Sequence, residues 1–151
     1  MKLKGLLLAL PLFLLAACAT RPGSVDAGQW IAPGDAVQLA AAAPQRGVTG
    51  VFAMTVRGTG TTRRTHLNSE EDYRDQRNLS VTVWPAAAAQ LTGEFGAPPH
   101  VALLGKQILV AGTARRVRID FISEGQRTGK YYYQTHVDVT DASQIQVRQP
   151  D

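Results

Sequence analysis

An alternation of apolar and polar side chains, which recurs between residues 48 and 147, restricts the fold of this chain more than any other feature. In the segment NLSVTVW, Leu79, Val81 and Val83 fall on one face of an extended chain, whereas Ser80 and Thr82 fall on the other. A period of two residues is typical of a β-strand with one buried face. The pattern therefore predicts a mainly β domain.

Five segments carry this pattern, separated by short polar stretches rich in glycine and proline. The predicted strands are 48–58, 62–68, 78–84, 106–122 and 130–139, and a shorter piece at 143–147 ends the domain. The GTGT stretch at 58–61 predicts the turn of a hairpin between the first two strands, and EGQRTG at 124–129 predicts another turn. Gly112 predicts a bend within the fourth strand, because a residue without a side chain lets a sheet coil sharply.

Two short helices are also expected. Asp35 is a candidate N-cap for an alanine-rich helix at about 36–42, and Pro44 and Gly47 are candidate stop signals. Pro85 follows the third strand and suits the first turn of a helix in the segment AAAAQL. The expected order is three strands, a short helix and two further strands.

This order resembles the oligonucleotide/oligosaccharide-binding (OB) fold, and so do the segments VTGVF, LLGKQILVAGTA and VDVTDASQIQV within residues 47–147. The resemblance implies a small five-stranded Greek-key β-barrel with one helix after the third strand. It also implies a ligand surface across the second and third strands. An open antiparallel sandwich would bury the same alternating residues and stays an alternative.

The amino terminus has the pattern of an export signal. Lys2 and Lys4 precede an apolar segment at 5–17, which is short for a membrane-spanning helix. The following residues, Leu15-Ala16-Ala17-Cys18, resemble the bacterial lipobox, and Cys18 is the only cysteine. The resemblance implies cleavage before Cys18 and attachment of diacylglyceryl and palmitate-type acyl chains. Ala19 implies sorting to the outer membrane.

The predicted organisation is a signal peptide at 1–17, the lipidated cysteine with a flexible tether at 18–34, and one domain at 35–151 with its core at 47–147. Removal of the signal peptide takes away two lysines and lowers the formal net charge from +4 to +2. The basic pI therefore gives little support to nucleic-acid binding. A lipidated Cys18 would leave no thiol for a disulfide.

The sequence contains no enzyme signature. Residues 66–78 are rich in charge, but Glu70, Glu71, Asp72 and Asp75 lack the spacing of a calcium loop or of a glycosidase pair. The three histidines lack the close spacing of a zinc site. We therefore expect no catalytic residues, no metal and no cofactor, and we interpret the acidic loop 70–75 as a solvated connection held by local ion pairs.

A binding surface is the remaining hypothesis, because ligands of the resembled fold stack on aromatic rings and are steered by basic groups. The candidate ligand-binding residues are Arg63, Arg64, His66, Tyr73, Arg74, Trp84, Tyr132 and His136. A second basic cluster, ARRVR at 114–118, is interpreted as a sheet edge protected by charge.

Three functions follow as hypotheses. The first is a non-catalytic lipoprotein, anchored by its lipid in the outer membrane and facing the periplasm, that binds an envelope protein or a glycan. The second is single-stranded nucleic-acid binding by the barrel. The third is hydrolysis by the acidic loop 70–75. The sequence leaves the oligomeric state open.

Overall fold

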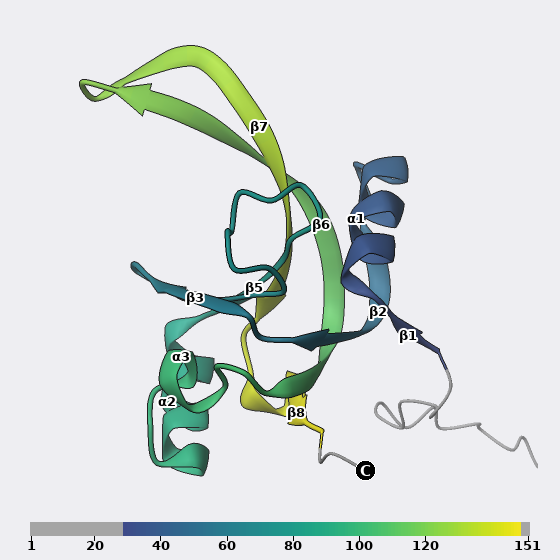
Figure 1. Cartoon of the computed structure of the whole chain (residues 1–151), viewed down its shortest axis with the longest axis vertical. Helices are drawn as coiled ribbons and strands as arrows, with labels where there is room; N and C mark the ends of the chain where they lie inside the picture. The colour runs from purple at the N-terminus through teal and green to yellow at the C-terminus, as the bar shows by residue number, and fades with distance from the viewer. Residues whose placement is uncertain (1–28, 149–151) are drawn as a thin grey trace, which may run out of the picture.

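The computed structural model describes residues 29–148, which form eight strands in one curled mixed sheet with short helices around it (Figure 1). The strands are β1 (Trp30–Ile31), β2 (Val48–Thr55), β3 (Gly58–Thr61), β4 (Thr65–Asn68), β5 (Leu79–Val83), β6 (Gln107–Ser123), β7 (Gln126–Val139) and β8 (Ile145–Val147). The helices are α1 (Pro33–Ala42), α2 (Pro85–Phe95), α3 (Pro99–Ala102) and a 3-10 turn, η1 (Ala142–Gln144). The predicted mainly β class is confirmed. No helix within 29–148 has the length and apolar character needed to cross a membrane.

The sheet curls because one continuous run of chain supplies strands at both of its sides. The strand order is β1-β2-β6-β7-β5-β4-β3, with β8 paired to β6. Only Val56 and Arg57 separate β2 from β3. The N–H of Val56 donates to the carbonyl of Lys106, whereas the N–H of Arg57 donates to the carbonyl of Asn68, each over 2.9 Å. The chain thus changes its pairing partner between two adjacent residues.

The stretch GTGT is a strand, so the predicted turn at 58–61 is wrong. The reversal lies one step later, where the N–H of Thr62 donates to the carbonyl of Arg64 over 2.9 Å. A Cβ atom on Gly58 would lie 2.9 Å from the carbonyl oxygens of Glu70 and Glu71. Gly58 is therefore required because another loop packs against the strand.

The number of strands also differs from the five expected. The added strands are β3, which was predicted as a turn, and the short strand β1, whereas β8 corresponds to the short piece predicted at 143–147. Strands β5 and β7 pair in parallel, as do β1 and β2, and all eight belong to one sheet. The alternative of an open antiparallel sandwich is therefore wrong for residues 29–148.

The core fills the inside of the curled sheet. The predicted inward face of β5 is confirmed, because Leu79, Val81 and Val83 have no exposed surface. Phe52 of β2 and Leu91 of α2 are buried in the same cluster. Helix α1 lies beside β2 and β6, and α2 and α3 lie at the lower end of the sheet in Figure 1.

Helix α1 begins earlier than predicted. Its N-cap is Ala32, Pro33 occupies the first turn, and Asp35 lies in that turn without capping the helix. The predicted tether extended to residue 34, but Trp30 and Ile31 pair with Val51 and Phe52 of β2. Helix α2 begins at Pro85, as predicted, and ends at Phe95, and its C-cap Gly96 has a φ of 71°, in the left-handed region.

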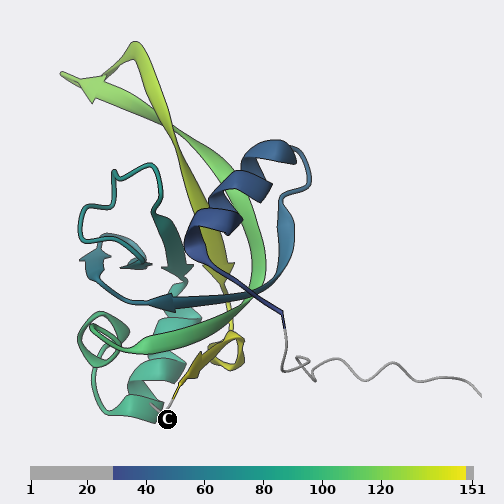
Figure 2. The ribbon, with the colours of Figure 1, turned by 45° about the vertical axis from the view of Figure 1, so that its right-hand side comes forward.

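Strands β6 and β7 extend beyond the rest of the sheet as a two-stranded arm, defined here as residues 115–134. The last residue of β6 that pairs with β2 is Ala114, opposite Val48. The first residue of β7 that pairs with β5 is Thr135, opposite Leu79. The arm projects from the upper end of the molecule in Figures 1 and 2. Its turn is Glu124 and Gly125, shorter than the predicted turn at 124–129.

Candidate ligand-binding site

A pocket of about 530 Å³ lies on the outer face of β3, β4, β5 and β7. Register places His66 of β4 opposite Thr82 of β5, and Thr82 opposite Asp138 of β7. The neighbouring side chains on the same face of these strands complete the polar floor of the pocket. The pocket-lining residues used below are His66, Asn68, Tyr73, Tyr132, Gln134 and His136.

A chain of hydrogen bonds crosses this floor. Thr82 Oγ1 lies 3.4 Å from Nδ1 of His66 and 3.1 Å from Nδ1 of His136. His136 Nε2 lies 2.7 Å from Oε1 of Gln134. The Gln134 amide then donates through Nε2 to the hydroxyl of Tyr132 over 2.9 Å. The five side chains therefore hold one another in place.

The network assigns the proton positions. The backbone carbonyl of Tyr73 can only accept, and it lies 3.5 Å from Gln134 Nε2, which orients the amide. Gln134 Oε1 consequently accepts from Nε2–H of His136. With Nε2 protonated, Nδ1 of neutral His136 accepts the Thr82 hydroxyl proton, and Thr82 Oγ1 is left to accept from Nδ1–H of His66.

Both histidines are held in the neutral form. Burial lowers the pKa of His136 from 6.5 to about 4, helped by its neighbour His66 and opposed by Asp138. Burial also lowers the pKa of His66, with a further contribution from Arg64. At neutral pH, Glu71 is then the one formally charged side chain among the described residues that line the pocket.

The loop 69–78 forms one wall, and Asn78 positions it. The Asn78 amide donates to Oδ1 of Asn68 over 3.1 Å and to the carbonyl of Tyr73 over 3.3 Å. Its Oδ1 accepts from the N–H of Glu70 over 3.1 Å and from the hydroxyl of Ser69 over 3.4 Å. Asn78 is almost fully buried, so this hub fixes where Tyr73 stands.

The charges of the loop are organised in local pairs. Asp72 accepts from the N–H and the guanidinium of Arg74, and Asp75 does the same for Arg77. The hydrogen bonds from Arg77 lower the pKa of Asp75 to about 2. Glu70 lies 3.6 Å from Arg57. Glu70, Asp72 and Asp75 are thus in ion pairs, as interpreted from the sequence.

The structure brings four of the eight candidate residues into the pocket, namely His66, Tyr73, Tyr132 and His136. The other four lie outside its lining. Arg64 stacks over the Trp84 ring at 3.7 Å, and Trp84 Nε1 donates to Asp138 over 3.1 Å. Arg74 lies over the Tyr73 ring at 5.6 Å. Arg63 is exposed in the bend before β4.

Several lining residues were not singled out from the sequence. Asn68, Ser80 and Gln134 lie on the outward face of strands that the sequence predicted. Their positions in the two-residue alternation could therefore have indicated them. Thr59 and Thr61 were missed because their segment was interpreted as a turn. The edge of the pocket at β3 could not be predicted from that interpretation.

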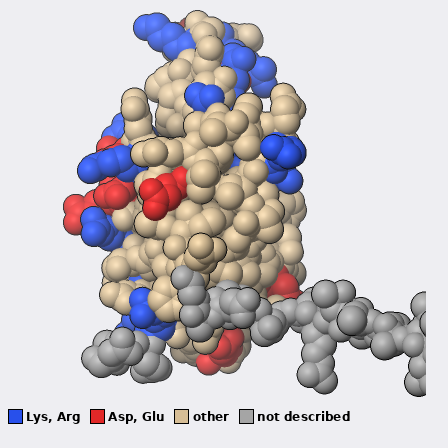
Figure 3. Space-filling view, turned by 90° about the vertical axis from the view of Figure 1, so that its right-hand side faces the viewer, with Lys and Arg blue, Asp and Glu red and all other residues tan. Residues whose placement is uncertain are grey.

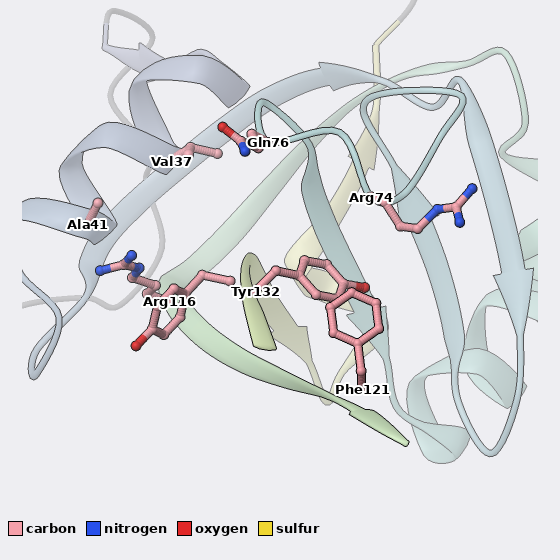
Figure 4. A pocket seen from close by; sticks show the side chains of 8 residues that line it. Val37, Ala41, Arg74, Gln76, Arg116, Phe121 and Tyr132 are labelled. Atoms are coloured by element: carbon pink, nitrogen blue, oxygen red, sulfur yellow. The ribbon is translucent and has the colours of Figure 1, made fainter. Parts of the chain in front are cut away.

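A second pocket, of about 540 Å³, lies on the other side of Tyr132 (Figure 4). Val37 and Ala41 of α1 form one side, and Arg116, Phe121 and Tyr132 of the arm form the other. Tyr132 lines both pockets, and its ring centroid lies 5.3 Å from that of Phe121. The two pockets therefore share one aromatic wall.

Residues 29–148 contain no group of three or more His, Cys, Asp or Glu side chains arranged to hold a metal ion. His66 and His136 lie near each other, with ring centroids 6.1 Å apart, whereas His100 belongs to α3. Thr82 and Gln134 already engage three of the four ring nitrogens of the close pair.

Comparison with models of known protein families finds none that matches this chain, and comparison with curated proteins finds no matching sequence.

Proposed function

We propose that this chain is a non-catalytic binding protein and that its outer-face pocket binds a neutral glycan. The observation that carries the proposal is the convergence of Tyr73, Tyr132, His66 and His136 on one pocket with a pre-organised polar floor. Pockets of this size bury a small ligand rather than a flat protein surface. Between the envelope protein and the glycan left open by the sequence, the pocket favours the glycan.

The charge of the pocket supports a neutral ligand. No Lys or Arg is among its described lining residues, and both histidines are neutral near pH 7. A surface that tracks phosphates would need cations at this place. Amide, hydroxyl and imidazole groups instead match the donors and acceptors of sugar hydroxyls. This composition argues against single-stranded nucleic acid as the occupant.

The absence of catalysis is part of the proposal. Glu70, Asp72 and Asp75 are held by arginines, and Glu71 stands alone at the pocket. A glycosidase needs two carboxyl groups facing one another across the scissile bond. The paired state of the other carboxylates therefore supports binding without hydrolysis.

We further propose that the curled sheet is a barrel of the OB type. If β2 and β3 are counted as one strand, the long strands number five, and α2 follows the third of them. The joined strand β2–β3 pairs with β6 through its β2 part and with β4 through its β3 part, which supports closure of the sheet into a barrel. The pocket lies over β4 and β5, the second and third strands of such a barrel.

The anchor and the compartment are proposed from the amino terminus. Cys18 and its lipobox-like surroundings lie outside the described residues, and their support is the sequence pattern alone. Two or three acyl chains would hold the domain on a membrane, since burial contributes roughly 0.8 kcal/mol per methylene. We propose attachment to the outer membrane, with the domain facing the periplasm.

Titration calorimetry of the purified protein with a panel of neutral tetrasaccharides tests the glycan proposal. Tyr132→Ala should weaken binding about tenfold or more, because an aromatic platform contributes on the order of 1 to 3 kcal/mol. The matched control is Tyr131→Ala, which removes a neighbouring ring from the opposite face of β7. This control should bind as the wild type does.

The alternatives make different predictions for the same protein. Binding of a single-stranded oligonucleotide that weakens steeply with salt, without binding of any tetrasaccharide, would support the nucleic-acid hypothesis. Turnover of a bound oligosaccharide that is lost in Glu71→Gln would support the hydrolase. Equal affinities of the Tyr131→Ala and Tyr132→Ala variants would contradict the proposed pocket.

The anchor has its own test. Cells that express the protein are labelled with radioactive palmitate and fractionated, and a Cys18→Ser variant is the control. We expect label and membrane association in the wild type only. Unlabelled wild-type protein, or a variant processed and located like the wild type, would remove the anchor from the proposal and leave the pocket unaffected.

A further inference from the structure

The arm presents a sheet edge that no other described strand covers. Strand β6 pairs with β2 over residues 107–114 and with β8 over 108–110, but residues 115–123 pair only with β7. Their second edge is therefore open within residues 29–148. A two-stranded ribbon is marginally stable in water, and a third strand would stabilise it.

Gly47 is the reason why the edge opens at Arg115. Strand β2 starts at Val48, opposite Ala114, and Gly47 has a φ of 71°, in the left-handed region. The chain turns away toward α1 at this point. An extended segment added along residues 115–123 would run in line with β2 and continue its position in the sheet.

Arg116 and Arg118 on this strand stack on tyrosines of β7, whereas Arg115 Nη1 donates to the carbonyl of Gln45 over 3.5 Å. Arg118 pairs with Tyr133 in the strand register, but its guanidinium carbon lies 4.1 Å from the ring centroid of Tyr131. The guanidinium carbon of Arg116 lies 3.6 Å from the ring centroid of Tyr133. The edge was interpreted from the sequence as protected by these charges. Because the guanidinium groups of Arg116 and Arg118 stack on the tyrosines, these two side chains leave the backbone of the edge accessible.

The arm is basic and rich in interface-type residues. It carries five Lys or Arg side chains against Asp120 and Glu124, and Asp120 is already paired with Arg118 and Arg127. Figure 3 shows several Lys and Arg side chains at the end of the molecule where the arm projects. Tyr131 and Ile122 are 49% and 60% exposed. Tyrosine and arginine are enriched where proteins bind proteins.

We propose that the open edge of β6, residues 115–123, binds an extended acidic segment of a partner protein as an added β-strand. Main-chain hydrogen bonds along the edge supply the affinity, and the arginines select carboxylates in the segment. This docking edge adjoins the glycan pocket, because Ile119 also lines that pocket. An anionic lipid surface is the competing occupant of a basic and partly apolar arm.

The test uses the full-length purified chain in a neutral detergent and a synthetic ten-residue peptide of alternating Glu and Val, labelled with a fluorophore. Fluorescence anisotropy measures its Kd. Two control peptides have Lys in place of Glu, or N-methyl groups on alternate backbone nitrogens. We expect the Glu-Val peptide to bind and each control peptide to bind about tenfold or more weakly.

Charge reversal locates the surface. Arg116→Glu and Arg118→Glu should each weaken the Glu-Val peptide about tenfold, whereas the matched control Arg63→Glu, exposed outside the arm, should not. Circular dichroism checks that each variant is folded. Arg115→Glu, on the opposite face of β6, replaces any variant that fails this check, with the same expected loss.

Backbone hydrogen exchange gives an independent readout. Binding should slow the exchange of amides within 115–123 and leave the exchange of β4 and β5 amides unchanged. The proposal is overturned if the N-methylated peptide binds as well as its parent, because charge alone would then explain the affinity. It is also overturned if the arm variants lose binding to phosphatidylglycerol vesicles while the peptide never binds.

Discussion

The hydroxyl oxygen of Thr82 lies 3.1 Å from Nδ1 of His136, and donation of its proton requires that this ring nitrogen carry none. His136 Nε2–H is committed to Gln134 over 2.7 Å. A second proton, on Nδ1, would require the Thr82 hydroxyl to turn and accept a hydrogen bond from the ring. Burial lowers the pKa of His136 and so opposes this proton.

Stability should depend on pH through His136. The folded chain binds this proton near pH 4 and the unfolded chain near 6.5, so the unfolded state binds more protons between these values. The free energy of unfolding should fall as the pH drops from 7 to 4, by up to about 3 kcal/mol. Urea unfolding at a series of pH values measures it.

A His136→Gln variant should lose most of this pH dependence. The control is His100→Gln, which alters α3 and leaves the network intact. If the slope between pH 4 and 6.5 is the same in all three proteins, His136 does not carry the effect. Because burial also lowers the pKa of His66, a His66→Gln variant should reduce the slope in the same direction.

Gly112 should not tolerate a methyl group. An added Cβ would lie 2.7 Å from Cγ1 of Val137, a buried and branched side chain. Gly112→Ala should lower the free energy of unfolding by about 1 to 3 kcal/mol. Gly60→Ala, in another strand with open space around it, should have little effect. Thermal unfolding compares the two.

The steric explanation has a direct check. Val137→Ala alone should destabilise by creating a cavity, but in the double variant the two changes should partly compensate. Strict additivity of the two losses would show that Gly112 is required for a reason other than the contact with Val137.

Asn78 should be the most sensitive residue of the loop 69–78. Asn78→Ala removes the partner of Asn68 and of the Tyr73 carbonyl and should lower the free energy of unfolding by about 1 to 3 kcal/mol. The comparison is Asp72→Asn, an exposed change within a local pair, which should leave stability nearly unchanged. The reverse order of the two losses, measured by urea unfolding, would contradict the role of Asn78 as a hub.

Helix α2 should stabilise the lower end of the sheet through Leu91. Leu91 has no exposed surface, so Leu91→Ala should lower the free energy of unfolding by about 2 to 5 kcal/mol. Leu39→Ala makes the same chemical change in α1, where the side chain is 45% exposed, and should have a small effect. Equal losses in calorimetry would mean that α2 does not close the core.

The local sequence pattern predicted which face of a strand is buried better than it predicted what lies next to the strand. Alternation identified the buried side of β5 because Leu79, Val81 and Val83 repeat every second residue. Tyr131 and Tyr133 alternate in the same way, yet both are exposed, at 49% and 41%. A strand's own sequence does not tell whether a hydrophobic core packs over it. Tyr131 and Tyr133 lie in the arm, where Arg118 and Arg116 stack on their rings.

The pocket was predictable in part for a similar reason. His66 and His136 are 70 residues apart in the sequence, and they meet only because β4, β5 and β7 are neighbours in the sheet. Residue type suggested each of them, but register between distant strands brought them together. The hub role of Asn78 depends on the folded loop and had no signal in spacing or composition.

The switch of partners between Val56 and Arg57 restricts how the length of this chain can vary in evolution. One inserted residue there would turn every side chain of β3 to the opposite face while β2 kept its own register. Such an insertion would move Thr59 and Thr61, which now share the face of Leu67 and Thr65, to the face of His66. Insertions and deletions should therefore collect at the bend 62–64 and at the tip of the arm, where no strand changes its pairing partner.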